Sequence, residues 1–151
     1  MVILEGARVA KLLSNLVYEK KQVHERSVDL TVKSLARLAT TGSIDFGGSE
    51  YATGEKVPLI PGKMTADDKY GWWLLAAGEF IAEYNERLSL PPEHLAIIQP
   101  HERLLEIGVT HGTRVLTEPD EKLVSLIHVC QADVRIKENA RISKLIVLRH
   151  E

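Results

Sequence analysis

Cysteine is nearly absent from this chain of 151 residues, in which Cys130 is the only one. Disulfide frameworks and cysteine-based zinc sites need several cysteines, so neither class of protein fits. The surrounding letters "LIHVC" predict a strand, with Cys130 as an inert thiol in the core. The chain also lacks an apolar run of the ~20 residues that span a bilayer, and no basic segment precedes an apolar one at its start. We therefore expect no membrane partner, no signal peptide and a cytoplasmic location.

An excess of charge of one sign is also lacking, because 19 basic residues stand against 21 acidic ones and the net charge is −2. This balance argues against a general nucleic-acid-binding surface, although it allows a local basic pocket. The sequence contains no nucleophile elbow (G-x-S-x-G), Walker loop or dinucleotide fingerprint. Its histidines include no zinc-protease pair. His101 and His111 flank a predicted strand, "LLEIGVT", and could converge on a metal, but surface or turn positions are the favoured interpretation, so we expect no metal site.

The apolar pattern that is present changes its period along the chain. Apolar residues recur at helical spacing from Val9 to Leu16, which predicts one amphipathic helix over 5–16. In "RSVDLTVK" apolar and polar residues alternate, which predicts a half-buried strand. Residues 40–70 are rich in Gly, Pro, Thr and Asp, as turns are, and short apolar runs separated by turn residues follow. Length and pattern together predict a single all-β domain over 1–151, a sandwich or barrel with one N-terminal helix outside it.

The stretch "QPHERLLEIG" at 99–108 concentrates ionisable side chains among apolar ones, just before a glycine. Arg103 is a candidate for gripping phosphate, because a guanidinium offers paired donors to an anion. Glu102 or Glu106 could act as a general base if its carboxylate were desolvated. A solvated turn is the alternative, since charged residues after a proline often mark one. The residues alone leave both interpretations open.

Two further positions stand out in predicted strands. Asp29 lies between Val28 and Leu30, where aspartate is uncommon. It is either a solvent-facing carboxylate or one aimed at a shared pocket, where it holds a metal-bound phosphate or a neighbouring arginine. Trp72 and Trp73 are adjacent, so a strand would send them to opposite faces. At least one is then expected in the core, which leaves the other available to a partner subunit.

Three elements resemble a known family in their order and spacing. "RSVDLTV" resembles its "SVDLRLG" strand, and "GWWLLAAGEFIAEYNERLSLPPEHLA" resembles its hairpin around "GEF" and the "LP" that follows. "NARISKLIVLR" resembles its closing "GMRIGQLVF". The likeness runs nearly from end to end. The chain thus resembles the dCTP deaminase branch of the trimeric dUTPase superfamily.

This resemblance implies a distorted jelly-roll β barrel that forms a homotrimer, with nucleotide sites between subunits. It implies dCTP or dUTP as the partner, with the triphosphate carried as a Mg²⁺ complex. Members of the family hold the phosphates with the Arg and Ser side chains of a "GRSSLxRLG" motif. The glutamate of a later "TLEL" motif activates water in the deaminases.

The stretch "PHERLLEIG" aligns with that phosphate motif but differs from it in chemistry. His101 falls on the first arginine, and Glu102 and Arg103 fall on the two serines. Glu106 falls on the second arginine, while Gly108 matches the closing glycine. A carboxylate at Glu102 repels phosphate, and at an effective dielectric constant of ~20 one such contact at ~4 Å is worth about 4 kcal/mol. Arg103 can offset this repulsion, either by pairing with Glu102 or by reaching phosphate itself.

The remaining family positions divide between matches and losses. Asp29 and Arg141 match their motifs, and Lys144 stands where the family has glutamine. Leu126 falls near the position of the "TLEL" glutamate, and a leucine cannot transfer protons. A replacement base would have to come from another carboxylate: Glu102, Glu106, Glu118 or Asp120.

We therefore expect a homotrimeric dCTP deaminase/dUTPase-like barrel that binds a deoxynucleoside triphosphate and whose catalysis is weakened or lost. The candidate catalytic residues are Glu102 and Glu106. The expected nucleotide- and phosphate-binding residues are Asp29, His101, Arg103, Arg141 and Lys144. One alternative is an active nucleotide hydrolase, dCTP deaminase or dUTP diphosphatase, with a relocated base. The other is a structural or regulatory trimer without a nucleotide.

Overall fold

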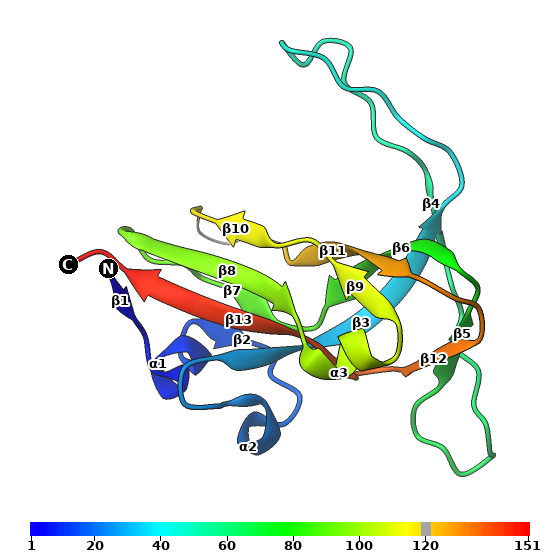
Figure 1. The fold of residues 1–151 in the computed structure, drawn as a ribbon, viewed down its shortest axis with the longest axis horizontal. Helices are drawn as coiled ribbons and strands as arrows, with labels where there is room; N and C mark the ends of the chain where they lie inside the picture. The colour runs from blue at the N-terminus through cyan, green and yellow to red at the C-terminus, as the bar shows by residue number, and fades with distance from the viewer. Residues whose placement is uncertain (119–121) are drawn as a thin grey trace.

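The computed structural model describes residues 1–118 and 122–151, and within them the chain is built mainly from strands (Figure 1). The helices of this part have five residues or fewer, and none is long and apolar enough to cross a membrane. They are α1 (Gly6–Ala10), α2 (Glu19–Gln22) and α3 (Glu102–Glu106). The strands are β1 (Val2–Ile3), β2 (Leu13–Ser14), β3 (Val28–Leu38), β4 (Lys56–Pro58), β5 (Trp72–Leu75), β6 (Gly78–Tyr84), β7 (Arg87–Leu88), β8 (His94–Pro100), β9 (Val109–His111), β10 (Arg114–Leu116), β11 (Val124–Val129), β12 (Val134–Lys137) and β13 (Arg141–Arg149).

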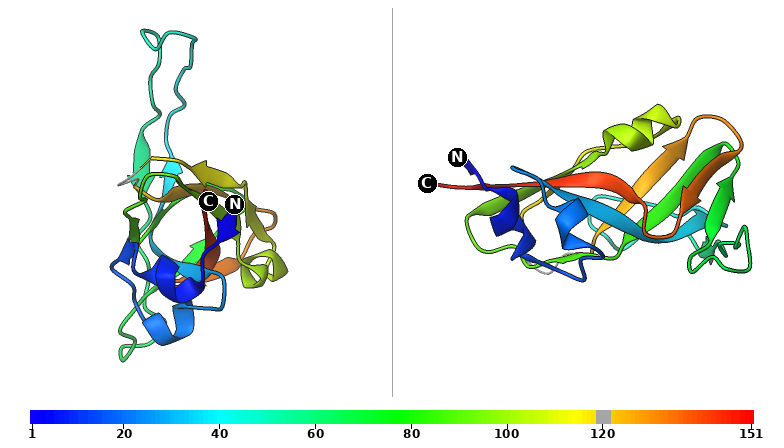
Figure 2. Two further views of the ribbon diagram at one scale, coloured as in Figure 1. Left: turned by 90° about the vertical axis from the view of Figure 1, so that its left-hand side faces the viewer. Right: turned by 90° about the horizontal axis from the view of Figure 1, so that it is seen from below.

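Nine strands form one antiparallel sheet, whose main path runs β10-β8-β13-β3-β6-β11-β9. β1 adds beside β13, and β4 adds beside β3. The sheet curls on itself, so that it forms a half-barrel with the chain termini at one end (Figures 1 and 2). Two small sheets, β12–β5 and β2–β7, complete the described fold. The prediction of an all-β fold is confirmed.

Aliphatic side chains fill the inside of the curled sheet. Val28, Leu30 and Val32 of β3 are completely buried, as the alternating pattern predicts. Leu145 of β13 is paired with Val28 and is equally buried. Burying one such side chain stabilises the fold by about 1.5–3 kcal/mol, so this alternation fixes which face of β3 points inward.

The opposite face of β3 is covered as well, although the sequence predicts a half-buried strand. Asp29 and Thr31 are at most 1% exposed. Gln22 of α2 covers Asp29, because its side-chain amide donates to the Asp29 carbonyl oxygen over 2.9 Å. The carboxylate of Glu86 accepts from the N–H and the hydroxyl of Thr31, at 2.8 and 2.6 Å. Burial raises the pKa of Glu86, although these hydrogen bonds oppose the shift.

The N-terminal helix is much shorter than the predicted 5–16 segment. α1 ends at Ala10, and the chain then continues as β2, which pairs with β7. The helical spacing still contributes to packing, since Val9 is completely buried. Pairing with a strand far away in the sequence thus overrides the local helical pattern.

The stretch "LLEIGVT" is not the single strand that the sequence predicts. Its first part belongs to α3, whose N-terminal backbone is capped by His101: the ring Nδ1 accepts from the N–H of Arg103 over 3.1 Å. Gly108 has a φ of 84°, a conformation that suits glycine at a helix end. Only the residues after it form a strand, β9.

Side-chain placement corrects one sequence prediction and confirms another. Cys130 is exposed rather than buried, because it follows the inward-facing Val129 and lies one residue beyond the end of β11. The two tryptophans do face opposite sides of β5. Trp73 is 3% exposed and its indole N–H donates to the Leu59 carbonyl oxygen over 3.1 Å, whereas Trp72 is only half-buried.

The turn-rich region predicted for 40–70 includes a long excursion between β3 and β4. Residues 39–55 extend well away from the sheet (Figure 1). The two arms of this excursion are joined by backbone hydrogen bonds between Ser43 and Ala52, at 2.9 and 3.0 Å. Gly42 permits that approach, because a Cβ there would lie 1.9 Å from the carbonyl oxygen of Ala52.

Candidate functional site

α3 and the start of β13 bring most of the predicted site residues together. The backbone N–H of His101, just before α3, donates to the carbonyl oxygen of Ile142 over 2.9 Å. In the register of β13 with β3, Lys144 lies opposite Asp29. Segments that are about 40 to 115 residues apart in the chain therefore meet at one corner of the sheet.

Asp29 is the centre of this cluster and is completely buried. Its Oδ2 accepts from Arg141 Nη1 at 3.0 Å, and it lies 2.8 Å from His24 Nε2 and 3.5 Å from His101 Nε2. Arg141 also donates to the carbonyl oxygen of Lys21 over 3.1 Å. The interpretation of Asp29 as a solvent-facing carboxylate is therefore wrong, and its actual role in the fold is to hold a neighbouring arginine. His24 belongs to the cluster although no sequence pattern singled it out.

His101 is a buried, neutral support for the cluster. Burial lowers its pKa, and this effect outweighs the opposing influence of the Asp29 and Glu102 carboxylates. Because Nδ1 accepts from the Arg103 N–H, the single ring proton lies on Nε2, which faces Asp29. A neutral imidazole held in this way cannot replace the positive charge of the arginine that the family has at this position.

The carboxylate of Glu102 is engaged with Lys144 rather than with a reacting group. Lys144 Nζ donates to Glu102 Oε1 over 2.5 Å. This hydrogen bond lowers the pKa of the exposed Glu102. A general base works best with a pKa near the working pH, so the shift moves Glu102 away from that role.

The other candidate bases are no better placed. Glu106 lies on the exposed side of α3, and Glu118 is exposed beyond β10. Asp120 lies outside the described residues. Leu126, near the position of the family's glutamate, is 55% exposed on β11. None of the described candidates combines a carboxylate with the desolvated setting that raises a pKa toward neutrality.

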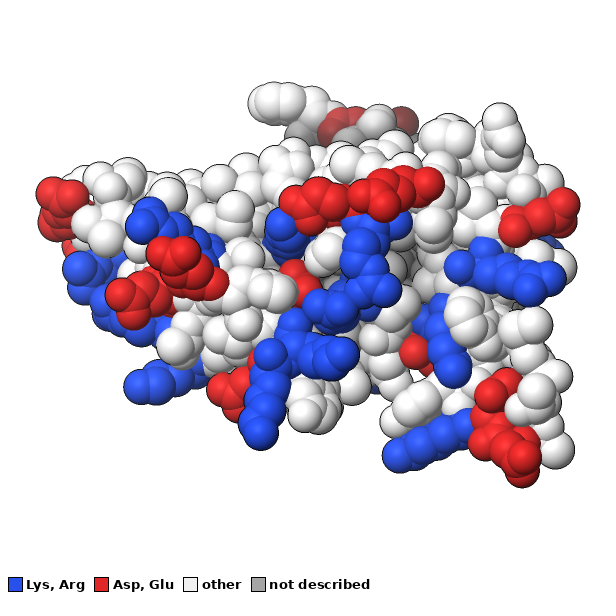
Figure 3. Space-filling model, turned by 60° about the horizontal axis from the view of Figure 1, so that its bottom comes forward, with Lys and Arg blue, Asp and Glu red and all other residues white. Residues whose placement is uncertain are grey.

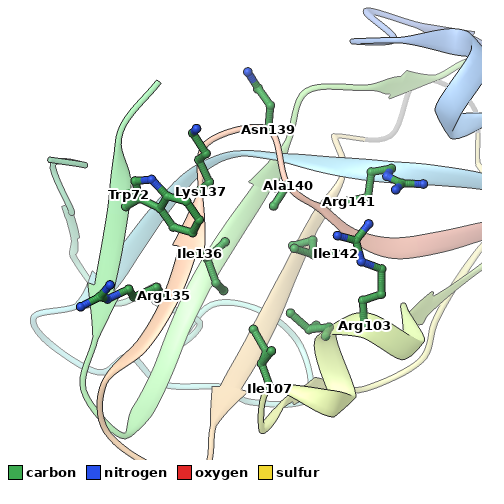
Figure 4. A pocket seen from close by; sticks show the side chains of 11 residues that line it. Trp72, Arg103, Ile107, Arg135, Ile136, Lys137, Asn139, Ala140, Arg141 and Ile142 are labelled. Carbon is green, nitrogen blue, oxygen red and sulfur yellow. The ribbon is translucent and has the colours of Figure 1, made fainter. Parts of the chain in front are cut away.

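A cavity of about 460 Å³ opens between α3, β12 and the start of β13 (Figure 4). Arg103 and Arg141 line it at one end, where the guanidinium of Arg141 is turned toward Asp29. Trp72, Arg135 and Lys137 line it from the other end, with aliphatic side chains between. Within residues 1–118 and 122–151, no carboxylate belongs to its lining. The cavity is therefore suited to an anion that also has an apolar part.

The surface around this cavity is unevenly charged, despite the balanced total. Lys and Arg side chains form a connected group in the middle of the face that carries α2, α3 and β12, and further Lys and Arg side chains lie apart from it on both sides (Figure 3). Acidic side chains lie around this group, most of them along its upper border in that view. This is the local basic pocket that the composition allows.

The sequence itself matches a family model over residues 3–150, described as dCTP deaminase-like. The chain belongs to the dCTP deaminase-like family. The match covers almost the whole chain, and it confirms the resemblance drawn from the three sequence elements.

Two relatives illustrate the similarity in sequence. A probable deoxyuridine 5′-triphosphate nucleotidohydrolase from Methanosarcina mazei is 29% identical over 137 residues, which cover 89% of this chain and 77% of that protein. A protein of the same description from Archaeoglobus fulgidus is 26% identical over 157 residues, covering 99% of this chain and 89% of its own length.

The fold is shared with a solved structure of the same superfamily. The 2′-deoxycytidine 5′-triphosphate deaminase from Agrobacterium tumefaciens superposes with a TM-score of 0.67 over 97% of this chain, at 15% sequence identity. This chain spans about half of that protein, 48% of its length. The likeness establishes the dUTPase-like β fold.

The site residues do not fit a Mg²⁺ ion bound by the protein itself. The family resemblance implies Mg²⁺ only as part of a nucleotide complex. Mg²⁺ needs several oxygen ligands in near-octahedral geometry. In the part of the chain that the structure describes, no group of three or more His, Cys, Asp or Glu side chains is arranged to hold a metal. Asp29 directs one oxygen at two imidazoles and at the guanidinium of Arg141, whose positive charge already offsets the negative charge of the carboxylate. Any magnesium would therefore have to be held by the phosphates themselves.

A second polar cluster lies inside the half-barrel and was missed by sequence reasoning. His111 Nδ1 donates to the Gly112 carbonyl oxygen (2.8 Å), so the neutral ring must accept at Nε2 from the Ser143 hydroxyl (2.7 Å). Ser143 then accepts from Tyr84, and Tyr84 accepts from Ser125 (2.7 Å). Burial lowers the pKa of His111 and raises that of Tyr84. The only sequence signal was serine at inward positions of two strands.

Proposed function

We propose that this family member binds a pyrimidine deoxynucleoside triphosphate, dCTP or dUTP, and that its hydrolytic chemistry is weakened or lost. One observation carries the proposal: Arg103 and Arg141 line a single cavity whose described lining contains no carboxylate. Guanidinium groups at hydrogen-bonding distance from phosphate are typical of anion recognition. Deamination or pyrophosphate release needs an activated water, and among the described residues no carboxylate lines the cavity to activate one.

Arg141 suits this role because it is already oriented. Its Nη1 is fixed by Asp29 and by the Lys21 carbonyl, while its side chain remains 25% exposed and lines the cavity. Arg103 has no ion pair among residues 1–118 and 122–151, so its guanidinium is available to a ligand. Lys144 supplies a further positive charge nearby, but it is shared with Glu102.

The proposal extends to assembly and cofactor. The probable nucleotidohydrolases and the deaminase of this family support a nucleotide ligand, which would bring Mg²⁺ with its phosphates. We propose a homotrimer, as the family resemblance implies, and a cytoplasmic location. Light scattering at micromolar protein should return a trimer, and a stable monomer would contradict this part.

The test is to incubate the purified protein with dCTP or dUTP and Mg²⁺, and to separate the products by chromatography. Calorimetric titration of the same nucleotides measures binding. We expect binding with at most traces of dUTP, dUMP or pyrophosphate formed. Arg103→Ala should weaken binding tenfold or more, since a charge-assisted contact is worth about 1.5–3 kcal/mol. Arg37→Ala, which removes an exposed arginine of β3 outside the cavity, is the matched control.

Two outcomes would contradict the proposal. Robust turnover would establish an active hydrolase with a relocated base, and Glu102 and Glu106 would then be the first residues to test by substitution. If titration of the unmodified protein with either nucleotide released no heat, the interpretation as a structural or regulatory trimer without a nucleotide would take its place.

A further inference from the structure

The 39–55 excursion ends in an ordered tip whose large apolar side chains no described part of the chain covers. Asp45 holds the tip together, because its carboxylate accepts from two backbone N–H groups of the same turn, both over 2.9 Å. Phe46 is 109% exposed and Ile44 is 87% exposed. An ordered loop that presents large apolar side chains is preorganised for contact with another molecule, since little conformational freedom remains to be lost on binding.

The charges of the excursion indicate what such a molecule must offer. Between residues 39 and 55 the chain contains Asp45, Glu50 and Glu55 but neither lysine nor arginine. The side chain of Glu50, at the tip, forms no ion pair with residues 1–118 and 122–151. The tip is therefore complementary to a surface that combines positive charge with an uncovered apolar or aromatic side chain.

The end of the cavity formed by Trp72, Arg135 and Lys137 is such a surface (Figure 4). The Trp72 indole is half-buried, and the Lys137 ammonium lies 5.3 Å from the centroid of its ring. Arg135 is exposed and forms no ion pair with the part of the chain that the structure describes. An indole and an unpaired guanidinium thus lie together, as the acidic and aromatic tip requires.

These two surfaces do not meet within one chain. The excursion leaves the sheet beside β4 and extends away from β5 and β12 (Figures 1 and 2). Contact between them therefore requires a second copy. Because each copy would use one surface to give and a different one to receive, the contact is heterologous, and heterologous contacts can close into a ring such as a trimer.

We propose that the tip of the 39–55 excursion packs on the Trp72 end of the cavity in a second copy of this chain, with Phe46 against the indole and Glu50 on Arg135. This inference rests on the trimer of the proposed function, but not on nucleotide binding. It leaves the opposite end of the cavity to phosphate, and it makes the cavity wall incomplete until another copy closes it.

Cross-linking between copies tests the contact directly. In a Cys130→Ser background, which removes the exposed natural thiol, Glu50→Cys and Arg135→Cys are combined in one chain and treated with a short bis-maleimide reagent. We expect covalent dimers and trimers on a denaturing gel. Glu55→Cys with Arg135→Cys is the matched control, because Glu55 lies at the base of the same excursion, where its N–H donates to Thr40 Oγ1 over 2.9 Å.

Charge reversal tests the ion pair. Glu50→Arg or Arg135→Glu alone places like charges against each other, so the trimer should dissociate at a lower urea concentration, followed by light scattering. The double variant restores opposite charges in every copy and should return the midpoint toward that of the unmodified protein. Glu55→Arg, which changes the net charge equally, should leave the midpoint almost unchanged.

Acrylamide quenching of tryptophan fluorescence tests the apolar half of the contact. Trp73 is buried in the core, so the quenchable emission comes mainly from Trp72. Phe46→Ala uncovers the indole and should increase quenching in the trimer. Tyr51→Ala, which removes another exposed aromatic ring of the excursion, is the control and should leave quenching unchanged.

The outcomes separate this inference from the proposed function. A trimer that gives no cross-links between Glu50→Cys and Arg135→Cys, no rescue by the double reversal, or equal quenching in Phe46→Ala and the unmodified protein overturns the inference while nucleotide binding stands. The tip would then serve a partner of another sequence. A stable monomer contradicts both the proposed trimer and this contact. Circular dichroism of each variant verifies its fold.

Discussion

Two substitutions in the Asp29–Arg141 ion pair, Arg141→Ala and Asp29→Asn, should lower the free energy of unfolding by very different amounts. Both remove the same 3.0 Å contact, but the two charges differ in burial: the Asp29 side chain is 0% exposed and that of Arg141 is 25% exposed. Arg141→Ala leaves an ionised carboxylate in the interior with only two imidazoles beside it. Asp29→Asn leaves a guanidinium that reaches solvent and still donates to the Lys21 carbonyl.

The magnitudes follow from that asymmetry. Removing one partner of a buried ion pair costs about 3–5 kcal/mol, because an uncompensated charge stays behind. We assign that cost to Arg141→Ala. Asp29→Asn loses a charge-assisted hydrogen bond, which is worth about 1.5–3 kcal/mol and less where solvent screens the partner. The double variant should be more stable than Arg141→Ala alone, since neither charge is then left unpaired.

Urea unfolding at matched protomer concentrations measures these differences. With an m value of about 1–3 kcal/mol per molar urea, a gap of about 2 kcal/mol separates the two midpoints by roughly 1 M. Equal midpoints for the two single variants, or additive losses in the double variant, would show that Asp29 is stabilised by something other than Arg141 and would refute this reasoning.

Three further outcomes are expected. Tyr84→Phe removes a hydrogen-bond partner from the buried hydroxyls of Ser125 and Ser143, and it should lower the free energy of unfolding in urea by about 1–3 kcal/mol. An unchanged free energy would contradict the chain of hydrogen bonds from Ser125 through Tyr84 to Ser143. Glu102→Ser frees Lys144 and removes a repelling charge, which should tighten dCTP binding up to about fivefold by calorimetry; weaker binding would show that the ion pair assists the site. The lowered pKa of His111 provides stability that is present above its unfolded value of 6.5 and is lost as the pH falls. The free energy of unfolding of His111→Gln should therefore fall less steeply as the pH is lowered. An identical pH profile for the variant and the unmodified protein would show that His111 does not cause the loss of stability in acid.

Much of the fold follows from local patterns because strands bury alternate residues. The period-two pattern of β3 places its aliphatic side chains inward as predicted, and the adjacent tryptophans of β5 face opposite sides as predicted, but the polar face of β3 is buried rather than exposed. The failures arise where distant contacts decide. β2 pairs with β7 despite its helical spacing, and Cys130 is exposed because β11 ends one residue earlier.

The candidate site shows the same division. Residue type marked Arg103 as a candidate phosphate ligand, and the family resemblance added Arg141 as a second candidate and Leu126 as the expected loss of a base. They could not show that Lys144 neutralises Glu102, or that His24 and Gln22 close over Asp29. Such contacts join segments from different strands, so no spacing within the sequence encodes them.

The sequence by itself determined the family and the all-β architecture, because ordered motifs and alternating burial are local properties of the chain. Only the tertiary structure decided what the ionisable residues can do, because a pKa depends on burial and on neighbouring charges. Folding buries Asp29 against Arg141, engages Glu102 with Lys144 and opens a cavity from Arg103 to Trp72. These juxtapositions arise when the sheet curls, and they gather scattered basic side chains around the one cavity for which we propose anion binding.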